Sequence, residues 1–241
     1  MEKLGLGDIF ESNNHHRPVV LRRSLKICLF YESCFRNMIQ SLRNIDFILG
    51  AFVLGFLSMG FQLVASKLLA PYFGSSIIVW AFLISTFLSA FSCGSFLGGW
   101  ISKKALPIKR IVVRMILVVG ISGFAVTAFC GRPFLSLIDM YVQSLSIGLL
   151  MNCSLLFFVP ITMVSSIIPI ITDILAKRGL SAGVASGLVY GISTVGNISG
   201  VMGTTFILIP NFRISSILEA WVLVSLLCLT YIGYRIEKEE T

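Results

Sequence analysis

Long apolar runs divide most of this sequence into segments of the length that a membrane-spanning helix requires. A helix that crosses a bilayer needs about 20 consecutive apolar residues. Five runs meet that length, at 47–69, 77–100, 111–130, 184–209 and 215–234. A sixth run, 145–175, is too long for one straight span and contains Pro160 and Pro169, so it predicts a broken or strongly bent helix. The pattern therefore predicts six transmembrane helices.

A short polar break separates the first two runs. Lys67 lies near the end of the first run, and Pro71, Tyr72 and Gly74 follow it closely. Pro71 and Gly74 predict that the helix ends here and turns tightly into the next one. Tyr72 would then lie at the membrane interface, where aromatic rings are enriched.

Composition agrees with a membrane protein. Of the 241 residues, 56% are hydrophobic and 12% are charged, and the charged share is about half that of a soluble domain. The net charge of +8 needs no nucleic-acid partner, because sixteen of the 19 basic residues fall on one side of the predicted spans. The other side carries only Lys67, Arg132 and Arg213. By the positive-inside rule, both termini are expected in the cytoplasm and the spans in the inner membrane.

These patterns predict an all-α polytopic membrane protein in three parts. Residues 1–44 form a basic cytoplasmic tail, 45–234 a six-span domain, and 235–241 a short cytoplasmic tail. Apolar residues recur at three- and four-residue spacing over 25–43, which is typical of an amphipathic helix lying in the membrane interface. The alternative is a basic extension that only follows the positive-inside rule, and the two readings are compatible.

Few residues offer chemistry for catalysis or metal binding. His15 and His16 are the only histidines and lie in the polar tail, so no Ser-His-Asp set can form inside the spans. The six cysteines include no C-x-x-C pair, and four of them fall inside apolar runs. We expect no catalytic residue, no metal site and no cofactor.

Glycines spaced four apart recur in the apolar runs. They form three pairs, which are Gly94 with Gly98, Gly187 with Gly191, and Gly196 with Gly200. Small residues at this spacing let two helix backbones approach closely. We expect all six to serve helix packing, and the alternative is a substrate path lined by backbone.

Polar side chains inside the spans are the candidate binding groups, because polar groups at membrane depth mark function or helix contacts. The substrate-binding hypothesis takes four of them: Gln62, Lys67, Tyr190 and Asn197. Two alternatives stay open, since Lys67 can extend its amine to the interface and the two amides can bond between helices.

Four further polar residues of the spans are noted without a substrate role. Thr194 lies on the same span as Tyr190 and Asn197, and Asn152 lies in the fourth span. Asp173 is four residues before Lys177 and can pair with it at the surface. Glu219 opens the sixth span and can meet interfacial water.

Two stretches resemble the membrane half of fused spermidine-synthase-like proteins, the major facilitator/spermidine synthase fusions. The first is FQLVASKLLAPYFGSSIIVWAFLISTFLSAFSCGSFLGGWISKK at 61–104. The second half adds PITMVSSIIPIITDIL at 160–175 and ASGLVYGISTVGNISGVMGTTFILIP at 185–210. The resemblance covers about 45–234 and implies a bundle like one half of a major-facilitator transporter.

The chain departs from the family pattern at several places. Gln62 stands where the family usually has glutamate, Lys67 where it has arginine, and Asn197 where it has serine, while Ser166 lies near the motif's proline. The soluble aminopropyltransferase domain that follows in the fused members is not expected here. Any synthase activity would then need a separate polypeptide.

Three readings of function follow from the resemblance. In the first, the protein is a non-catalytic membrane module that anchors or assists a separate soluble aminopropyltransferase-like protein. In the second, it is a small-molecule transporter or half-transporter that works as a homodimer in the lipid bilayer. In the third, it is the remnant of a fusion protein. A polyamine substrate would favour acidic residues around a cavity, and only Asp173 and Glu219 are candidates.

Overall fold

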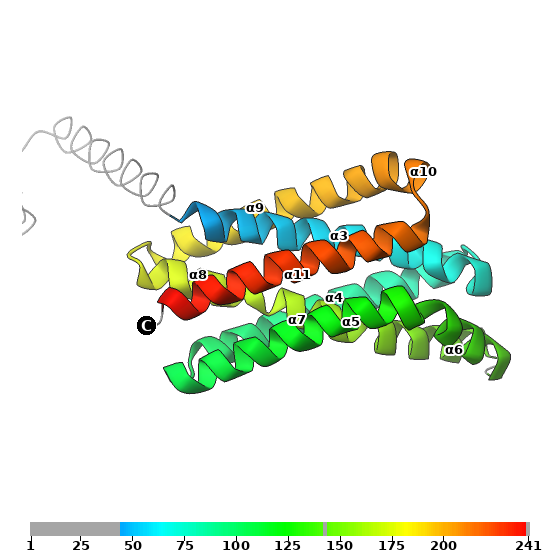
Figure 1. Ribbon diagram of the computed structural model, residues 1–241, viewed down its shortest axis with the longest axis horizontal. Coiled ribbons are helices and arrows are strands. Elements are labelled where there is room, and N and C mark those ends of the chain that lie inside the picture. The colour runs from blue at the N-terminus through cyan, green and yellow to red at the C-terminus, as the bar shows by residue number, and fades with distance from the viewer. Residues whose placement is uncertain (1–43, 142–143, 240–241) are drawn as a thin grey trace, which may run out of the picture. The chain divides into compact units, whose positions relative to one another are not determined.

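The computed structural model of the protein describes residues 44–141 and 144–239. Within these residues every regular element is a helix, and six spans are long and apolar enough to cross a membrane (Figure 1). This confirms the predicted all-α, multi-pass membrane fold. The predictions for the tail before residue 44, including the helix over 25–43 and the two histidines, lie outside the described residues.

Four of the spans are single or nearly straight helices, and two are chains of shorter pieces. The first three are α3 (Ile45–Phe73), α4 (Ile77–Ser102) and α5 (Leu106–Tyr141). The fourth joins α6 (Leu145–Asn152), η1 (Cys153–Phe158), α7 (Val159–Ser165) and α8 (Ile167–Lys177). The fifth joins α9 (Ala182–Gly203), η2 (Thr204–Leu208) and α10 (Ile209–Asn211), and the sixth is α11 (Ile214–Glu239).

Helix α3 forms the centre of the bundle. It packs against α9 and α11 most extensively, and it also contacts α4, α5, α7 and α8 (Figure 1). We call the end of the bundle where α3 begins and α11 finishes the terminal end, and the end that holds the α3–α4 turn the turn end. The spans run alternately between these two ends.

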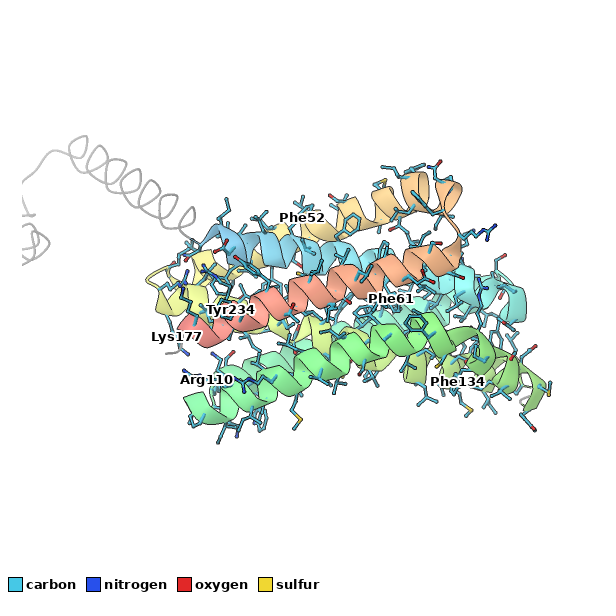
Figure 2. All side chains as sticks on the ribbon, viewed as in Figure 1. Phe52, Phe61, Arg110, Phe134, Lys177 and Tyr234 are labelled. Atoms are coloured by element: carbon cyan, nitrogen blue, oxygen red, sulfur yellow. The ribbon has the colours of Figure 1, made fainter. Side chains whose placement is uncertain are left out.

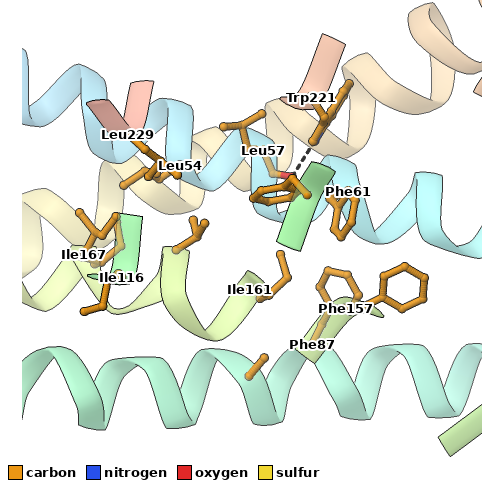
Figure 3. Close-up of a cluster of buried hydrophobic side chains, with 14 of the residues drawn as sticks. Leu54, Leu57, Phe61, Phe87, Ile116, Phe157, Ile161, Ile167, Trp221 and Leu229 are labelled. Atoms are coloured by element: carbon orange, nitrogen blue, oxygen red, sulfur yellow. Dashed lines mark hydrogen bonds between the residues drawn. The ribbon is translucent and has the colours of Figure 1, made fainter. Parts of the chain in front are cut away.

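Aromatic rings fill the core around α3. Phe61 lies 4.8 Å from Phe124 and 5.7 Å from Phe157 between ring centroids, both in edge-to-face geometry. Phe87 of α4 closes the group at 6.2 Å from Phe61. Trp221 of α11 packs nearby and donates a hydrogen bond from Nε1 to the carbonyl oxygen of Leu57, at 3.0 Å (Figure 3). Rings from four spans thus fix α3 against its neighbours.

The fourth span is interrupted, as its prolines predicted. Pro160 has no N–H to donate to the carbonyl of Leu156, four residues earlier. The structure compensates from a neighbouring helix, because Thr127 Oγ1 of α5 donates to that carbonyl at 3.0 Å. A π-helical stretch, η1, precedes Pro160, and a turn at Ser166 separates α7 from α8. The span is therefore one chain of short helices with a break.

The turn after α3 differs in part from its prediction. Pro71 does not end the helix, which continues to Phe73. Gly74 ends it instead, with φ of +74° and a hydrogen bond from its N–H to the carbonyl of Ala70 at 3.0 Å. That positive φ suits glycine, and a proline near a helix end removes only one hydrogen bond. Gly74 alone therefore supplies the stop.

Helix α5 is longer than the apolar run predicted, because it passes Pro133 and reaches Tyr141. Two residues beyond the expected end, Leu135 and Ile138, are buried, and Ile138 lies near Gly148 of α6. This packing favours continuation of the helix over the single hydrogen bond that Pro133 removes.

Charged side chains join helices at the terminal end. Arg235 of α11 forms an ion pair with Asp46 at the start of α3. Asp173 of α8 lies 3.5 Å from Nζ of Lys109 and 2.6 Å from Nζ of Lys177, so the expected Asp173–Lys177 pair is present. Figure 2 shows Lys177 at this end of the bundle. These contacts tie α11 to α3 and α8 to α5.

Candidate functional site

A partly open cavity of about 180 Å³ lies at mid-depth in the bundle. Helices α4 and α9 flank it, and α3, α7 and α8 form its floor. Its polar lining residues are Ser58, Ser95, Ser165, Tyr190, Ser193, Thr194 and Asn197, and its apolar ones are Leu54, Gly55, Met59, Phe91, Val164 and Ile168. No lining residue carries a charge. The cavity is smaller than the roughly 300–1,000 Å³ typical of sites for drug-sized ligands.

Three of the lining hydroxyls already donate to backbone carbonyls. Ser58 Oγ donates to Leu54 at 2.7 Å, and Thr194 Oγ1 donates to Tyr190 at 2.8 Å. Ser165 Oγ lies 3.1 Å from the carbonyl of Thr162. A hydroxyl has one donor and two acceptor positions, so these groups offer oxygen lone pairs to the cavity.

The other four polar side chains of the lining are free to bind. Ser95, Tyr190, Ser193 and Asn197 make no side-chain hydrogen bond with the part of the chain that the structure describes. The Asn197 amide contributes two donors and one acceptor, and each hydroxyl contributes one donor. The cavity can therefore both donate to and accept from a small polar molecule.

Close backbone contact between α3 and α9 builds one wall of the cavity. A Cβ at Gly55 would lie 2.2 Å from the carbonyl oxygen of Ser193. A Cβ at Gly196 would lie 2.1 Å from the carbonyl oxygen of Phe52, and one at Gly200 2.4 Å from that of Phe56. Only glycine fits at these positions, and the approach brings Ser193 beside the α3 wall.

A second close contact builds the opposite wall, between α4 and the fourth span. A Cβ at Gly94 would lie 1.9 Å from Oγ of Ser165, and one at Gly98 2.1 Å from the carbonyl oxygen of Ser166. Ser165 also bridges to α4 by a hydrogen bond from Oγ to the carbonyl of Ala90, at 3.3 Å. Gly94 thus makes room for a cavity side chain.

The remaining predicted packing pair is placed differently. No described atom lies within 4 Å of a Cβ built at Gly187 or Gly191. From Gly191 to Gly196 the helix turns by about 140°, at 100° per residue, so the two glycine pairs occupy different faces of α9. The face with Gly196 and Gly200 meets α3, and the face with Gly187 and Gly191 is left uncovered within the described bundle.

The four predicted binding residues fall in three places. Tyr190 and Asn197 meet in the cavity, one on each side of Ser193 along α9. Gln62 lies on the same face of α3 as Gly55, but one turn nearer the turn end than the last lining residue, Met59. It is half-buried and lines no part of this cavity.

Lys67 is on another face of α3. It follows Ser58 by nine residues, which is a rotation of about 180°. Its exposed side chain lines a separate depression at the turn end, with Arg132 of α5. The structure therefore does not bring Lys67 together with Tyr190 and Asn197.

Serines make up most of the lining that sequence reasoning missed. Ser58, Ser95, Ser165 and Ser193 lie within apolar runs, where a serine that bonds to its own helix is common. One signal was available on α9, because Ser193 follows Tyr190 by three residues and precedes Asn197 by four. That spacing places all three on one helix face.

Charged and metal-binding groups lie away from the cavity. Asp173 is held by the lysines at the terminal end, and Glu219 is exposed on α11. Asn152 is buried and donates to the carbonyl of Gly148 in its own helix, at 2.9 Å. Among the described residues, no group of three or more His, Cys, Asp or Glu side chains is placed to hold a metal ion.

Comparisons of the chain with protein families, with curated proteins and with solved structures find no match. The resemblance to the spermidine-synthase-like fusion family therefore stays a prediction from the motifs. The geometry of the cavity is the basis for the function proposed next.

Proposed function

We propose that this multi-pass membrane protein binds a small, uncharged polar solute in the cavity between α4 and α9, and that it is a transporter or half-transporter. One observation carries the proposal. Seven polar side chains converge at one cavity in the bundle, and four of them have no hydrogen-bond partner among the described residues. Polar groups at membrane depth are costly unless they meet a partner, a ligand or water.

The lining also selects the charge of the solute. A buried cation or anion needs an opposite charge or strong coordination to offset its lost hydration. This cavity offers hydroxyls, one amide and no charged group. The chemistry favours polyols, amides or similar neutral molecules over polyamines.

We propose that a second copy of the chain closes the cavity and completes the transport path. The cavity opens between α4 and α9, and only four of the 22 residues of α9 are buried, namely Ala185, Val189, Gly196 and Gly200. A transport site between two six-helix halves lies near the bilayer midplane, and this cavity lies about midway along the helices that line it. A homodimer that faces the α4–α9 opening would enclose the solute. We further propose cytoplasmic termini, since nine of the twelve described basic residues lie at the terminal end.

The proposal that the protein anchors or assists a separate aminopropyltransferase-like enzyme predicts a stable complex between the two. Co-purification with such an enzyme would support it. The cavity has no assigned role in that reading, so the geometry favours solute binding.

A thermal-shift screen of the purified protein in detergent tests the binding. The panel contains neutral polyols and amides, amino acids, and polyamines. A ligand at a hundred times its dissociation constant stabilises the folded state by about 2.7 kcal/mol, which such a screen detects. We expect a saturable shift with a neutral solute and none with polyamines.

Two serines of α9 give a matched pair of variants. Ser193 lines the cavity, whereas Ser199 bonds to the carbonyl of Val195 at 2.9 Å and does not line it. Ser193→Ala is expected to weaken solute binding by about fivefold, in line with about 1 kcal/mol for one hydrogen bond. Ser199→Ala is expected to leave binding unchanged. Equal effects of the two variants would count against binding in this cavity.

A further inference from the structure

The turn end holds a basic depression that is separate from the solute cavity. It has a volume of about 330 Å³ and is lined by Lys67, Leu68, Pro71, Tyr72, Arg132 and Ile214. These residues come from α3, α5 and α11, so three helices converge on it. Lys67 and Arg132 are both exposed.

The cations of the turn end gather at this place. Of the twelve described basic residues only Lys67, Arg132 and Arg213 lie at the turn end. The first two line the depression, and Arg213 immediately precedes its third wall, Ile214. Two positive charges from separate parts of the sequence thus line the depression, and a third directly precedes its α11 wall in the sequence.

These cations have no acidic partner among the described residues. No described carboxylate lies within 4 Å of Lys67, Arg132 or Arg213, although Asp139 and Glu219 belong to the same end. At the terminal end, by contrast, Asp173 and Asp46 pair with basic side chains. No described carboxylate therefore neutralises the positive charge of the depression.

Two further features suit an anion. Arg213 lies at the start of the 26-residue helix α11, whose first N–H groups have no partner within the helix and carry a partial positive charge. The Tyr72 hydroxyl lies 3.4 Å from the carbonyl oxygen of Arg132, which ties the end of α3 to α5 across the depression. Lysine supplies a point charge and arginine a planar fork, the pair of donors that phosphate groups commonly meet.

We propose that this depression binds a phosphate group at the membrane surface. Leu68, Pro71 and Ile214 give it an apolar floor beside the cations. That combination matches an anionic phospholipid, whose headgroup phosphate and acyl chains occupy polar and apolar surfaces together. A free phosphate ion shares the polar half of this chemistry. The site is independent of the proposed solute cavity.

The test measures phosphate binding by the full chain in two arms. In the first, the protein is placed in nanodiscs of phosphatidylcholine with a minor share of phosphatidylglycerol, and lipids retained on the protein are counted by native mass spectrometry. In the second, inorganic phosphate is titrated into phosphatidylcholine nanodiscs and thermal stability is followed. Retention of phosphatidylglycerol alone assigns the site to lipid, and a saturable response to phosphate assigns it to the free ion.

The variants are Lys67→Gln, Arg132→Gln and the double substitution. We expect about fivefold weaker binding for each single variant, because each cation near an anionic lipid surface contributes about 1 kcal/mol. Lys67→Arg should keep the binding. Lys103→Gln is the matched control, since Lys103 is an exposed lysine at the terminal end.

Both substituted side chains are exposed and form no ion pair with another described residue, so the variants are expected to fold. The proposal is overturned if the double variant retains lipid and responds to phosphate as the unaltered chain does. It is also overturned by an equal loss in Lys103→Gln, because that would show general attraction to anionic membranes.

Discussion

Replacement of Gly196 by alanine tests the close packing on which the cavity depends. The added Cβ would lie 2.1 Å from the carbonyl oxygen of Phe52, a backbone atom that no side-chain rotation can move. Cβ contacts below 3.0 Å are essentially never observed, so α3 and α9 must separate by at least 0.9 Å at this point. Overpacking of this kind typically costs about 1–3 kcal/mol.

The same helix supplies the matched control. Gly187→Ala makes the same chemical change where the new Cβ meets nothing within 4 Å. Since alanine forms helices better than glycine, the free energy of unfolding of this variant should stay the same or rise by up to about 1 kcal/mol. Both variants are expressed, purified and unfolded reversibly with a denaturing detergent in mixed micelles, and the free energies are compared.

The expected result is a loss of stability in Gly196→Ala and none in Gly187→Ala. Solute binding should fall in Gly196→Ala as well, because Ser193 and Asn197 flank the displaced position on α9. Equal stability of the two variants would refute the reasoning, since it would show that α3 and α9 do not approach at Gly196.

Three further substitutions test the contacts that hold the bundle together. Thr127→Val should cost about 1–2 kcal/mol, because it removes a hydroxyl that lies 3.0 Å from the carbonyl oxygen of Leu156 on another helix, as well as 3.0 Å from that of Gly123 in its own. Asp173→Asn should destabilise by about 2 kcal/mol, below the cost of breaking a fully buried pair because Asp173 is 26% exposed. Lys177→Ala should cost under about 1 kcal/mol, since its side chain is 61% exposed whereas that of Lys109 is 1% exposed.

Each of these has a control and a contrary outcome. Thr230→Val removes a hydroxyl that bonds only within its own helix on an exposed face, and it should be nearly neutral. Thr127→Val should lower the free energy of unfolding more than Thr230→Val does. If it does not, the hydrogen bond from Thr127 to another helix does not stabilise the bundle. If Asp173→Asn and Lys177→Ala lower the free energy of unfolding equally, the ion pair between Asp173 and Lys109 adds no stability. All four are measured by the same unfolding titration.

Helix number and class followed from the sequence because lipid imposes a simple rule. An unbroken apolar run must satisfy its backbone internally, so run length alone predicts a spanning helix. The ends of the helices were harder to predict from the sequence. Pro71 was predicted to help end its helix, but a proline there removes a single hydrogen bond and the helix continues to Phe73. The third helix extends beyond its predicted apolar run, and residues past Pro133, such as Leu135, are buried.

The cavity was predictable only in part. Tyr190 and Asn197 stood out because a polar ring and an amide are unusual in a span, and the structure places both in the lining. The serines did not stand out, since their hydroxyls can bond to their own helix. Lys67 and Gln62 were grouped with them by chemical type, but helix rotation and rise send them elsewhere. Which face of a helix meets a neighbour depends on packing between distant segments, which spacing in one sequence does not reveal.

Thiol accessibility along α9 tests the central claim, a polar cavity open to water-soluble molecules inside the membrane bundle. Single cysteines are introduced at Ser193, Asn197, Val195 and Ile198 in a background without native cysteines, and membranes are treated with a charged maleimide. The reagent needs a thiolate, which forms only where water reaches the thiol. Val195 and Ile198 are 54% and 58% exposed on the bundle surface, where we expect lipid to cover them.

We expect labelling at 193 and 197, protection there by the solute found in the screen, and little labelling at 195 and 198. Labelling confined to 195 and 198, or absent at 193 and 197, would contradict a water-accessible cavity at this site.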